Sequence, residues 1–143
     1  MRIDALLERK SGKVATVRPE ASVTEALGLL AEHNIGALVV STDGSKVDGI
    51  VSERDVVRRL QDTGPQILSG QVSAIMSSEV HTCAPSAEVD SLVELMTTRR
   101  IRHVPVVEDD RLVGIVSIGD VVKSRMDELE ADRKALEDYI YSR

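Results

Sequence analysis

Residues 49–55 read GIVSERD, and residues 114–120 read GIVSIGD. The similarity extends outward from these two stretches, because residues 14–60 align with residues 80–126 at an offset of 66 residues. The offset becomes 65 after one residue is lost in a turn, which is the only gap the alignment needs. Chance does not produce so many matches with a single gap, so the chain contains an internal repeat.

Both copies predict the same order of elements, β-α-β-β-α. Ser22 with Glu25 three residues later is typical of a helix start, and apolar residues follow at helical spacing. The first copy is expected to contain strands at 14–17, 37–40 and 47–51, with helices that begin at Ser22 and near Ser52. The second copy is expected to contain strands at 80–83, 103–107 and 112–116, with a closing helix that begins near Ser117.

Neither copy is long enough to bury a core alone, so the two must pack together. We therefore expect an α/β (α+β) fold in which two repeats form a module with a pseudo-two-fold axis. The expected domains are repeat 1 at 1–62, a Gly- and Pro-containing linker at 63–73, repeat 2 at 74–126 and a C-terminal amphipathic helix at 127–143. One helical stripe carries the apolar residues Val122, Met126, Leu129, Leu136 and Ile140, and Arg133 interrupts it.

Composition excludes several classes of function. The 143 residues include no Trp or Phe and two Tyr, so the core must be aliphatic, and aromatic platforms for sugars or single-stranded nucleic acid are not expected. The net charge of −6 argues against binding to nucleic acid or to an anionic membrane. No apolar run is long enough for a membrane span. With one cysteine, Cys83, and no signal-peptide pattern at residues 1–4, a cytoplasmic protein is expected.

The doubled motif, together with the segments 34–40 and 100–107, resembles a tandem pair of cystathionine-β-synthase-type (CBS) domains over about residues 5–126. The resemblance implies two clefts between the repeats that bind adenosine compounds: AMP, ADP, ATP, NAD(H) or S-adenosylmethionine. It also implies a stand-alone, non-catalytic regulatory or energy-sensing module that forms homodimers. The alternative is a dimeric protein-interaction scaffold that has no physiological nucleotide.

The Ser-x-x-Asp tetrads are the main candidate binding residues. A carboxylate can accept both hydroxyl donors of a ribose, and a serine hydroxyl with free helix N–H groups suits a phosphate. The resemblance implies that Asp55 and Asp120 hold ribose and that Ser52 and Ser117 face phosphate. The same tetrad is also typical of a helix N-cap with an acid at the third position, and the two roles are partly compatible.

A basic cluster at residues 99–103 distinguishes the second copy from the first. Arginine forks suit phosphate, although strand alternation predicts that Arg102 and His103 face opposite sides. The first copy has Gly36 and Ala37 here, so the clefts should differ: one favours a phosphate chain, and the other has room beside Ala37 and can recruit Arg54. A solvated, basic helix end is the alternative. The remaining candidates are Thr16 and Thr82, at the ends of the first strands, and Pro105, whose missing N–H fits a strand edge or a ligand contact.

Metal and catalytic sites are not expected. His33, His81 and His103 fall in different elements, and His81 with Cys83 lacks further ligands. The sequence contains no Gly-x-Ser-x-Gly elbow, no Walker loop and no cysteine with a placed base, so we do not expect an enzyme. The expected partners are an adenine nucleotide, a second copy that binds through the CBS faces and the C-terminal helix, and a regulated protein that the sequence does not identify.

Overall fold

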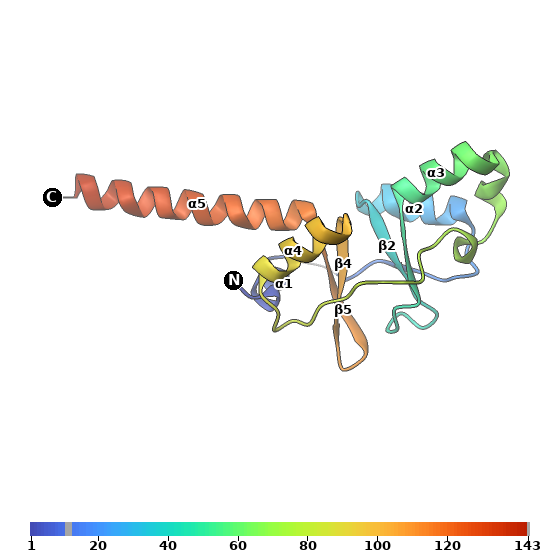
Figure 1. Ribbon diagram of the computed structural model, residues 1–143, viewed down its shortest axis with the longest axis horizontal. Coiled ribbons are helices and arrows are strands. Elements are labelled where there is room, and N and C mark those ends of the chain that lie inside the picture. Colours follow the sequence, from blue (N-terminus) through green and yellow to red (C-terminus); the bar gives the residue numbers. More distant parts are fainter. Residues whose placement is uncertain (11–12, 143) are drawn as a thin grey trace.

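The computed structural model describes residues 1–10 and 13–142 (Figure 1). It is a mixed α and β structure with two small sheets, each associated with its own helices, which confirms the expected fold class. The elements in order are α1 (Ile3–Arg9), β1 (Thr16–Val17), α2 (Val23–His33), β2 (Ala37–Val40), β3 (Gly49–Ser52), α3 (Glu53–Thr63), the 3-10 turns η1 (Pro65–Ser69) and η2 (Val72–Ala74), α4 (Val89–Arg99), β4 (His103–Glu108), β5 (Arg111–Ser117) and α5 (Ile118–Tyr141).

The first repeat is built on a three-stranded sheet in the order β1-β2-β3. β1 runs parallel to β2, with Thr16 opposite Val39, and β2 pairs antiparallel with β3, with Leu38 opposite Val51. All four residues of β2 are buried, as expected for a central strand covered on both faces. The core of this repeat consists of Val17, Val23, Ala26, Leu30, Leu38, Val40, Val51, Val56, Val72 and Ile75.

The second repeat has a two-stranded sheet of β4 and β5, because its expected first strand at residues 80–83 is reduced to one bridge. Cys83 alone pairs with β4: its N–H donates to Pro105 at 3.1 Å, and its carbonyl accepts from Val107 at 2.9 Å. Residues 80 and 81 instead lie along the boundary between the repeats. The core of this repeat consists of Ile3, Leu6, Val89, Leu92, Met96, Val104, Val106, Val116 and Val121.

The segment that comes before the first strand of each repeat packs against the other repeat. α1 precedes repeat 1, but the N–H of Ile3 donates to the carbonyl of Ala87 in repeat 2 at 2.8 Å. The connector precedes repeat 2, and the N–H of Val72 donates to Ala21 of repeat 1 at 2.8 Å. Ala21 and Ala87 are equivalent positions of the two copies, so the exchange obeys the repeat symmetry. α1 therefore does not belong to the core of the repeat that follows it.

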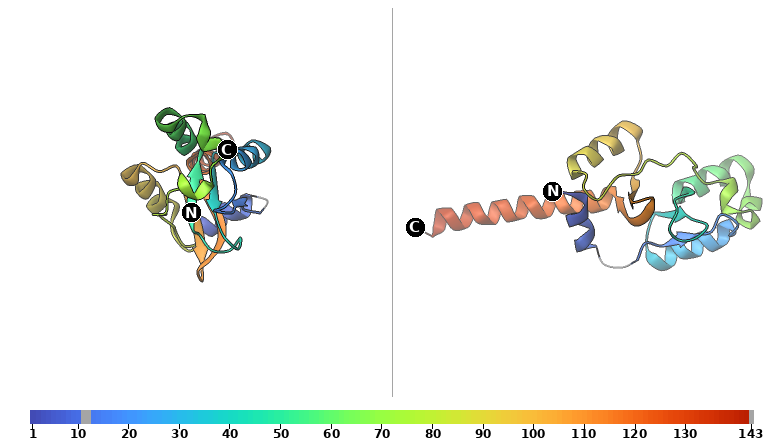
Figure 2. Two further views of the ribbon diagram at one scale, coloured as in Figure 1. Left: turned by 90° about the vertical axis from the view of Figure 1, so that its right-hand side faces the viewer. Right: turned by 90° about the horizontal axis from the view of Figure 1, so that it is seen from below.

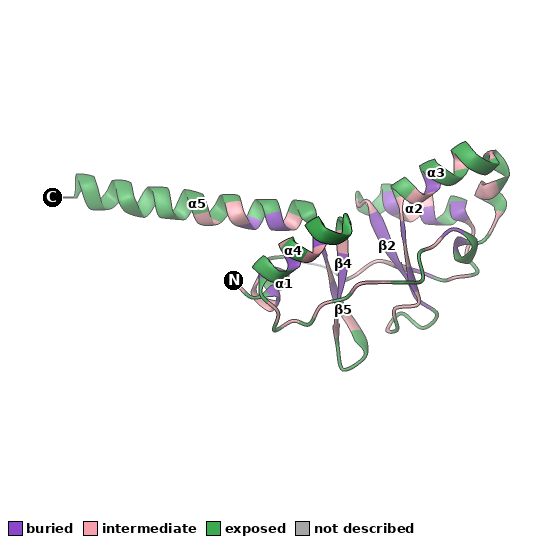
Figure 3. Cartoon of the chain, in the orientation of Figure 1, coloured by how far each residue is buried: buried purple, intermediate pink, exposed green. Residues whose placement is uncertain are grey.

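α5 is one continuous helix of 24 residues that joins the closing helix of repeat 2 to the expected C-terminal helix. Its first turns pack on repeat 2, and its distal part projects away from the described parts of both repeats (Figures 1 and 2). Figure 3 colours the residues of the projecting part as exposed. None of the described helices is long and apolar enough to cross a membrane.

Candidate functional site

A cleft between the two repeats, which we call cleft 1, has a volume of about 370 Å³. The first repeat contributes residues around the start of β2 and the β3–α3 junction. The second repeat contributes the segment between α4 and β4. The end of the connector, at residues 77–81, forms the third part of the lining. Its volume is within the range of pockets that hold small-molecule ligands. The lining residues are Gly36, Ala37, Ile50, Ser52, Glu53, Arg54, Asp55, Arg58, Ser77, Glu79, Val80, His81, Arg100, Ile101, Arg102 and His103.

Ser52 and Asp55 form a capping box at the start of α3. The N–H of Ser52 donates to Oδ2 of Asp55 at 2.8 Å, and the N–H of Asp55 donates to Oγ of Ser52 at 3.3 Å. The Ser52 hydroxyl also lies 3.0 Å from the same Oδ2. Among the described residues, no group donates to Oδ1 of Asp55. The helix cap thus uses one carboxylate oxygen and leaves the other unpaired at the lining of cleft 1.

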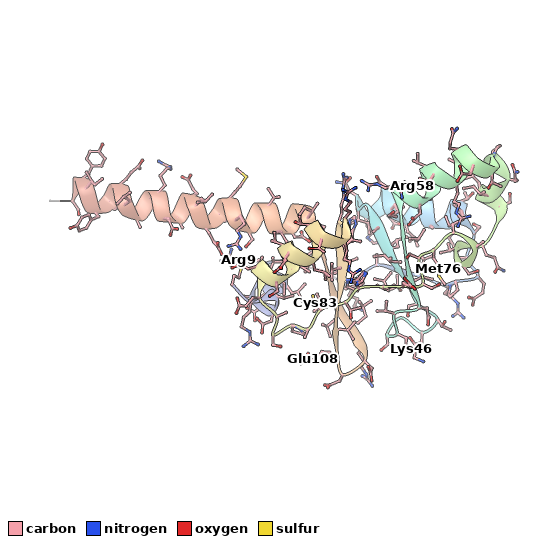
Figure 4. The ribbon with its side chains drawn as sticks, in the orientation of Figure 1. Arg9, Lys46, Arg58, Met76, Cys83 and Glu108 are labelled. Carbon is pink, nitrogen blue, oxygen red and sulfur yellow. The ribbon has the colours of Figure 1, made fainter. Side chains whose placement is uncertain are left out.

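Four arginines line cleft 1, together with the three carboxylates of Glu53, Asp55 and Glu79. Arg54 and Arg58 come from α3, and Arg100 and Arg102 come from the end of α4 and the bend before β4. Within the described part of the chain, none of the four forms an ion pair. Figure 4 shows Arg58 extending from α3 toward the second repeat. Three of them, Arg54, Arg100 and Arg102, also line a neighbouring cavity of about 310 Å³, so the positive charge continues beyond the cleft.

The His103 side chain lies against the backbone of Gly36, where the two repeats meet. A Cβ on Gly36 would be 3.4 Å from both Cε1 and Nε2 of the ring. Burial lowers the pKa of His103, and the nearby cations of Lys10 and Arg102 act in the same direction against the carboxylates of Asp120 and Glu53. The imidazole is therefore neutral at pH 7, so it can offer one hydrogen-bond donor and one acceptor.

Ser117 and Asp120 form the equivalent capping box at the start of α5, with bonds of 2.8 Å and 3.1 Å. Here, however, Nζ of Lys10 donates to Oδ2 of Asp120 at 2.7 Å and to the carbonyl of Ile115 at 2.8 Å. Burial alone would raise the pKa of Asp120, but the bonds from Lys10 and Ser117 outweigh it and lower that pKa. The two aspartates therefore have equivalent backbone positions and different charge environments.

Comparisons with known proteins agree with this architecture. The family model of the CBS domain matches residues 9–62 and 72–127. The chain belongs to the CBS-domain family. It is 36% identical over 116 residues to the CBS domain-containing protein YhcV of Bacillus subtilis, which covers 80% of each chain. It is 38% identical over 123 residues to the mitochondrial CBS domain-containing protein CBSX3 of Arabidopsis thaliana, which covers 83% of this chain but only 60% of that relative.

Solved structures of CBS-domain proteins have the same fold. A CBS-domain containing protein of Agrobacterium tumefaciens is 46% identical, with a TM-score of 0.84 over 87% of this chain and 99% of that one. A CBS domain protein of Pyrobaculum aerophilum complexed with AMP is 29% identical, with a TM-score of 0.75 over 84% and 89% of the two chains. The CBS domain pair of the protein MJ0100, in complex with 5-methylthioadenosine and S-adenosyl-L-methionine, is 26% identical, with a TM-score of 0.79 over 90% and 98%.

This CBS pair brings six of the residues expected from the sequence to cleft 1: Ala37, Ser52, Arg54, Asp55, Arg102 and His103. Arg102 and His103 both line it because Arg102 lies in a bend before β4, where strand alternation does not apply. The other five do not line it. Thr16 pairs within the first sheet, Thr82 is exposed, Pro105 is buried in β4, and Ser117 and Asp120 lie at the second capping box.

Several lining residues were not among the sequence candidates. Arg58 follows Asp55 by three residues on a helix, and this spacing places both side chains on one face, so the signal was available. Ser77, Glu79 and His81 come from the connector, and only the way the chain folds back along β3 places them in the cleft. Ser77 exchanges two backbone hydrogen bonds with Ile50, at 3.0 and 2.9 Å, which holds this part of the connector against β3.

Metal-binding clusters of three or more His, Cys, Asp or Glu are not found among the described residues. Burial raises the pKa of the Cys83 thiol to about 11. Cys83 is therefore a thiol rather than a reactive thiolate at neutral pH.

Proposed function

We propose that this CBS pair is a regulatory module that binds a phosphorylated adenosine compound in cleft 1. The observation that carries the proposal concerns the described residues: among them, Oδ1 of Asp55 is unpaired in a cleft that also contains four arginines without ion pairs. An acceptor-only carboxylate fits the two hydroxyl donors of a ribose, and guanidinium forks fit phosphate oxygens. These complementary groups lie within one cavity, so a single ligand can contact both.

The charge of cleft 1 favours AMP, ADP, ATP or NAD(H) over S-adenosylmethionine. Among the similar structures, the protein of Pyrobaculum aerophilum is complexed with AMP and the MJ0100 pair with sulfur-containing adenosine compounds. The four arginines outnumber the three lining carboxylates of Glu53, Asp55 and Glu79. The sulfonium of S-adenosylmethionine is a cation that the arginines repel, whereas they attract phosphate. We therefore infer that affinity rises with the number of phosphates.

The regulatory consequence follows from the position of cleft 1 between the two repeats. A ligand that touches α3 on one side and the α4–β4 segment on the other binds best at one spacing of the repeats. It therefore favours the arrangement of the repeats that it fits. The residues of the second capping box, Ser117 and Asp120, together with Thr16, Thr82 and Pro105, remain predicted contacts of a second, equivalent cleft.

Isothermal titration calorimetry and thermal shift with adenosine, AMP, ADP, ATP, NADH and S-adenosylmethionine test the proposal. At a ligand concentration 100 times the dissociation constant, folding should gain about 2.7 kcal/mol. Asp55→Ala should weaken binding of every adenosine compound at least about tenfold, and Arg58→Ala should weaken ATP more than adenosine. The absence of any response to these compounds at millimolar concentration would reject the nucleotide-binding function.

Two control variants separate binding from folding. Asp55→Ala also removes a helix cap, at a cost of about 0.5–2 kcal/mol. Asp120→Ala removes the equivalent cap of α5 outside cleft 1 together with the ion pair to Lys10, so it should lose at least as much stability while leaving binding at cleft 1 intact. Arg59→Ala, next to Arg58 but outside cleft 1, should leave ATP affinity unchanged.

A further inference from the structure

An unpartnered apolar stripe runs along α5. Its members are Val122, Met126, Leu129, Leu136 and Ile140, with exposed fractions of 50%, 64%, 69%, 61% and 54%. Their spacings of four, three, seven and four residues follow a heptad repeat, in which Arg133 occupies the one position without an apolar residue. At 100° per residue, all six positions fall within about 80° of arc, which is typical of a coiled-coil seam.

The stripe faces away from the contacts that hold α5 to repeat 2. Val121 and Ser124 are buried against that repeat, and Arg125 forms an ion pair with Asp90 of α4. From Leu129 to residue 142 every residue is exposed. An isolated helical segment of this length is marginally stable in water. The projecting half of α5 therefore needs a partner that covers its seam.

We propose that the partner is α5 of a second copy, and that the two helices form a short antiparallel coiled coil. A seam that contains leucine, isoleucine, valine and methionine at heptad positions is complementary to itself. The antiparallel register places Val122 opposite Ile140 of the second copy, Met126 opposite its Leu136, and Leu129 opposite its Arg133. All six seam positions of each helix are then used.

The position of Arg133 decides the orientation. A parallel pair would place Arg133 directly opposite its own copy in the seam, and like charges in one layer are destabilising. The antiparallel register instead places it opposite Leu129, whose side chain packs on the aliphatic part of the arginine. Arg133 already pairs with Glu130 and Glu137 of its own helix, so its charge is compensated at the edge of the seam.

The flanking charges of the antiparallel register include two attractive contacts. Lys123 and Glu137 lie on the same edge of the seam, and the register brings each Lys123 beside Glu137 of the second copy, once at either end. Glu130 meets its own copy near the centre, where the two Arg133 side chains lie next to it. On the other edge, the antiparallel register places Arg125 beside Tyr139 of the second copy and Asp132 beside its own copy. A parallel pair would instead place Asp132 beside Glu137 twice and Arg125 beside Glu130 twice, so the orientation depends on Arg133.

Analytical ultracentrifugation of the full chain over a concentration series tests the interface. Leu129→Glu and Leu136→Glu should each abolish dimerisation through α5. The mass of the assembly should then be half of the wild-type mass. The matched controls are Ala131→Glu and Ala135→Glu, which add the same charge on the opposite side of α5, and these should keep the wild-type mass. Equal masses for seam and control variants would overturn the proposal, whether the wild type is monomeric or dimerises through another face.

Cysteine cross-linking tests the orientation in a Cys83→Ser background. Chains with Met126→Cys are mixed with chains with Leu136→Cys and oxidised, and peptide mass spectrometry identifies the linked positions. We expect disulfides between residue 126 of one chain and residue 136 of the other. Linkage of 126 to 126 and of 136 to 136 would overturn the antiparallel register. Neither experiment contains nucleotide, so its failure is distinct from failure of the proposed binding function.

Discussion

Lys10 makes the two repeat-related aspartates unequal. Asp55 keeps an unpaired carboxylate oxygen at the lining of cleft 1, whereas Asp120 accepts a hydrogen bond of 2.7 Å from the Lys10 ammonium. The connector and α1 occupy equivalent positions in the two repeats. The segment after α1 places Lys10 next to Asp120, whereas the equivalent segment after the connector places Glu79 at the lining of cleft 1. A ligand that used Asp120 would have to compete with Lys10. We therefore expect cleft 1 to be the stronger site of the pair.

Replacing Lys10 should change stability in a pH-dependent way. The folded-state pKa of Asp120 lies below the ordinary value of 3.8, so the stabilisation is present above about pH 4 and is lost as the pH falls through the folded-state pKa. Lys10→Ala should therefore cost up to about 1 kcal/mol at pH 7 and less in strong acid, where only the bond from Lys10 to the carbonyl of Ile115 is left to lose. Urea unfolding at pH 7 and pH 3 measures this, with Lys13→Ala as the exposed control. A cost that is the same at both pH values would contradict the ion pair.

His103 should make the fold sensitive to mild acid. Its folded-state pKa is below 6.5 because burial and the cations of Lys10 and Arg102 disfavour the imidazolium. The unfolded chain therefore takes up the proton first, so stability falls as the pH drops below about 6.5 and levels off below the folded-state pKa. Unfolding free energies measured from pH 8 to pH 5 should decline less in His103→Gln than in the wild type. Identical slopes would show that His103 does not titrate in this way.

Sequence reasoning found the local part of the site and not the long-range part. Ser52 and Asp55 are three residues apart, so their cap could be predicted from spacing alone. The contact between Lys10 and Asp120 joins residues 110 positions apart, and nothing near either residue indicates it. The sequence alone predicts that Arg102 and His103 lie on opposite sides of a strand. Arg102 instead lies in a bend before β4, and its position depends on where α4 ends, at Arg99.

In each repeat, one glycine of the hairpin lies against the segment that precedes the other repeat. Gly49 faces the connector, and Gly114 faces α1. A Cβ on Gly49 would lie 2.6 Å from Sδ of Met76 (labelled in Figure 4) and 2.9 Å from the carbonyl oxygen of Ser77. The three atoms nearest to a Cβ on Gly114 all belong to the Leu7 side chain, with Cδ2 at 2.7 Å. Both close approaches require glycine, but only the first involves backbone.

Alanine at these glycines should therefore have graded effects. Gly49→Ala should cost about 1–3 kcal/mol, because the backbone of Ser77 cannot move without breaking its bonds to Ile50. Gly114→Ala should cost less, since the end of the Leu7 side chain can rotate. Gly28→Ala, with nothing within 4 Å in the exposed interior of α2, should stabilise by up to about 1 kcal/mol. Urea unfolding checks the order, which a larger cost at Gly114 than at Gly49 would contradict.

Prediction of the elements succeeded where a local pattern determined them. Both hairpins and the helices after Ser22, Ser52 and Ser117 follow from alternation and capping, and these are local signals. Of the strand expected at 80–83, Cys83 alone pairs with β4. Val80 and His81 line cleft 1 instead of extending the sheet. The apolar stripe from Val122 to Ile140 predicts a helix across residues 126 and 127, and α5 is continuous there. That this helix is also the closing helix that follows Ser117 was not predicted, although no glycine or proline lies between residues 120 and 141.

The exchange of preceding segments ties the two repeats into one folding unit. Ile3 contributes to the core of repeat 2, and Val72 contributes to the core of repeat 1. The chain therefore crosses between the repeats before each of them begins. Neither repeat retains a complete core when it is cut at the boundaries that the internal repeat suggests. A ligand in cleft 1 that changes the spacing of the repeats must also strain these crossing segments, which is a physical route from binding to output.

Loss of one crossing contact should consequently weaken both repeats. Ile3 is fully buried, so Ile3→Ala should cost about 2–5 kcal/mol, and Val72→Ala should cost about 1.5–3 kcal/mol. Hydrogen exchange followed by mass spectrometry should then show the slowest amides of β2 and of β4 exchanging faster by the same factor in either variant, because one cooperative transition exposes both strands. Glu108→Ala, on the exposed β4–β5 hairpin, serves as the control with wild-type exchange. If Ile3→Ala accelerated exchange in β4 and left β2 unchanged, the repeats would be separate units, and nucleotide binding in cleft 1 would have to act through rigid-body contact alone.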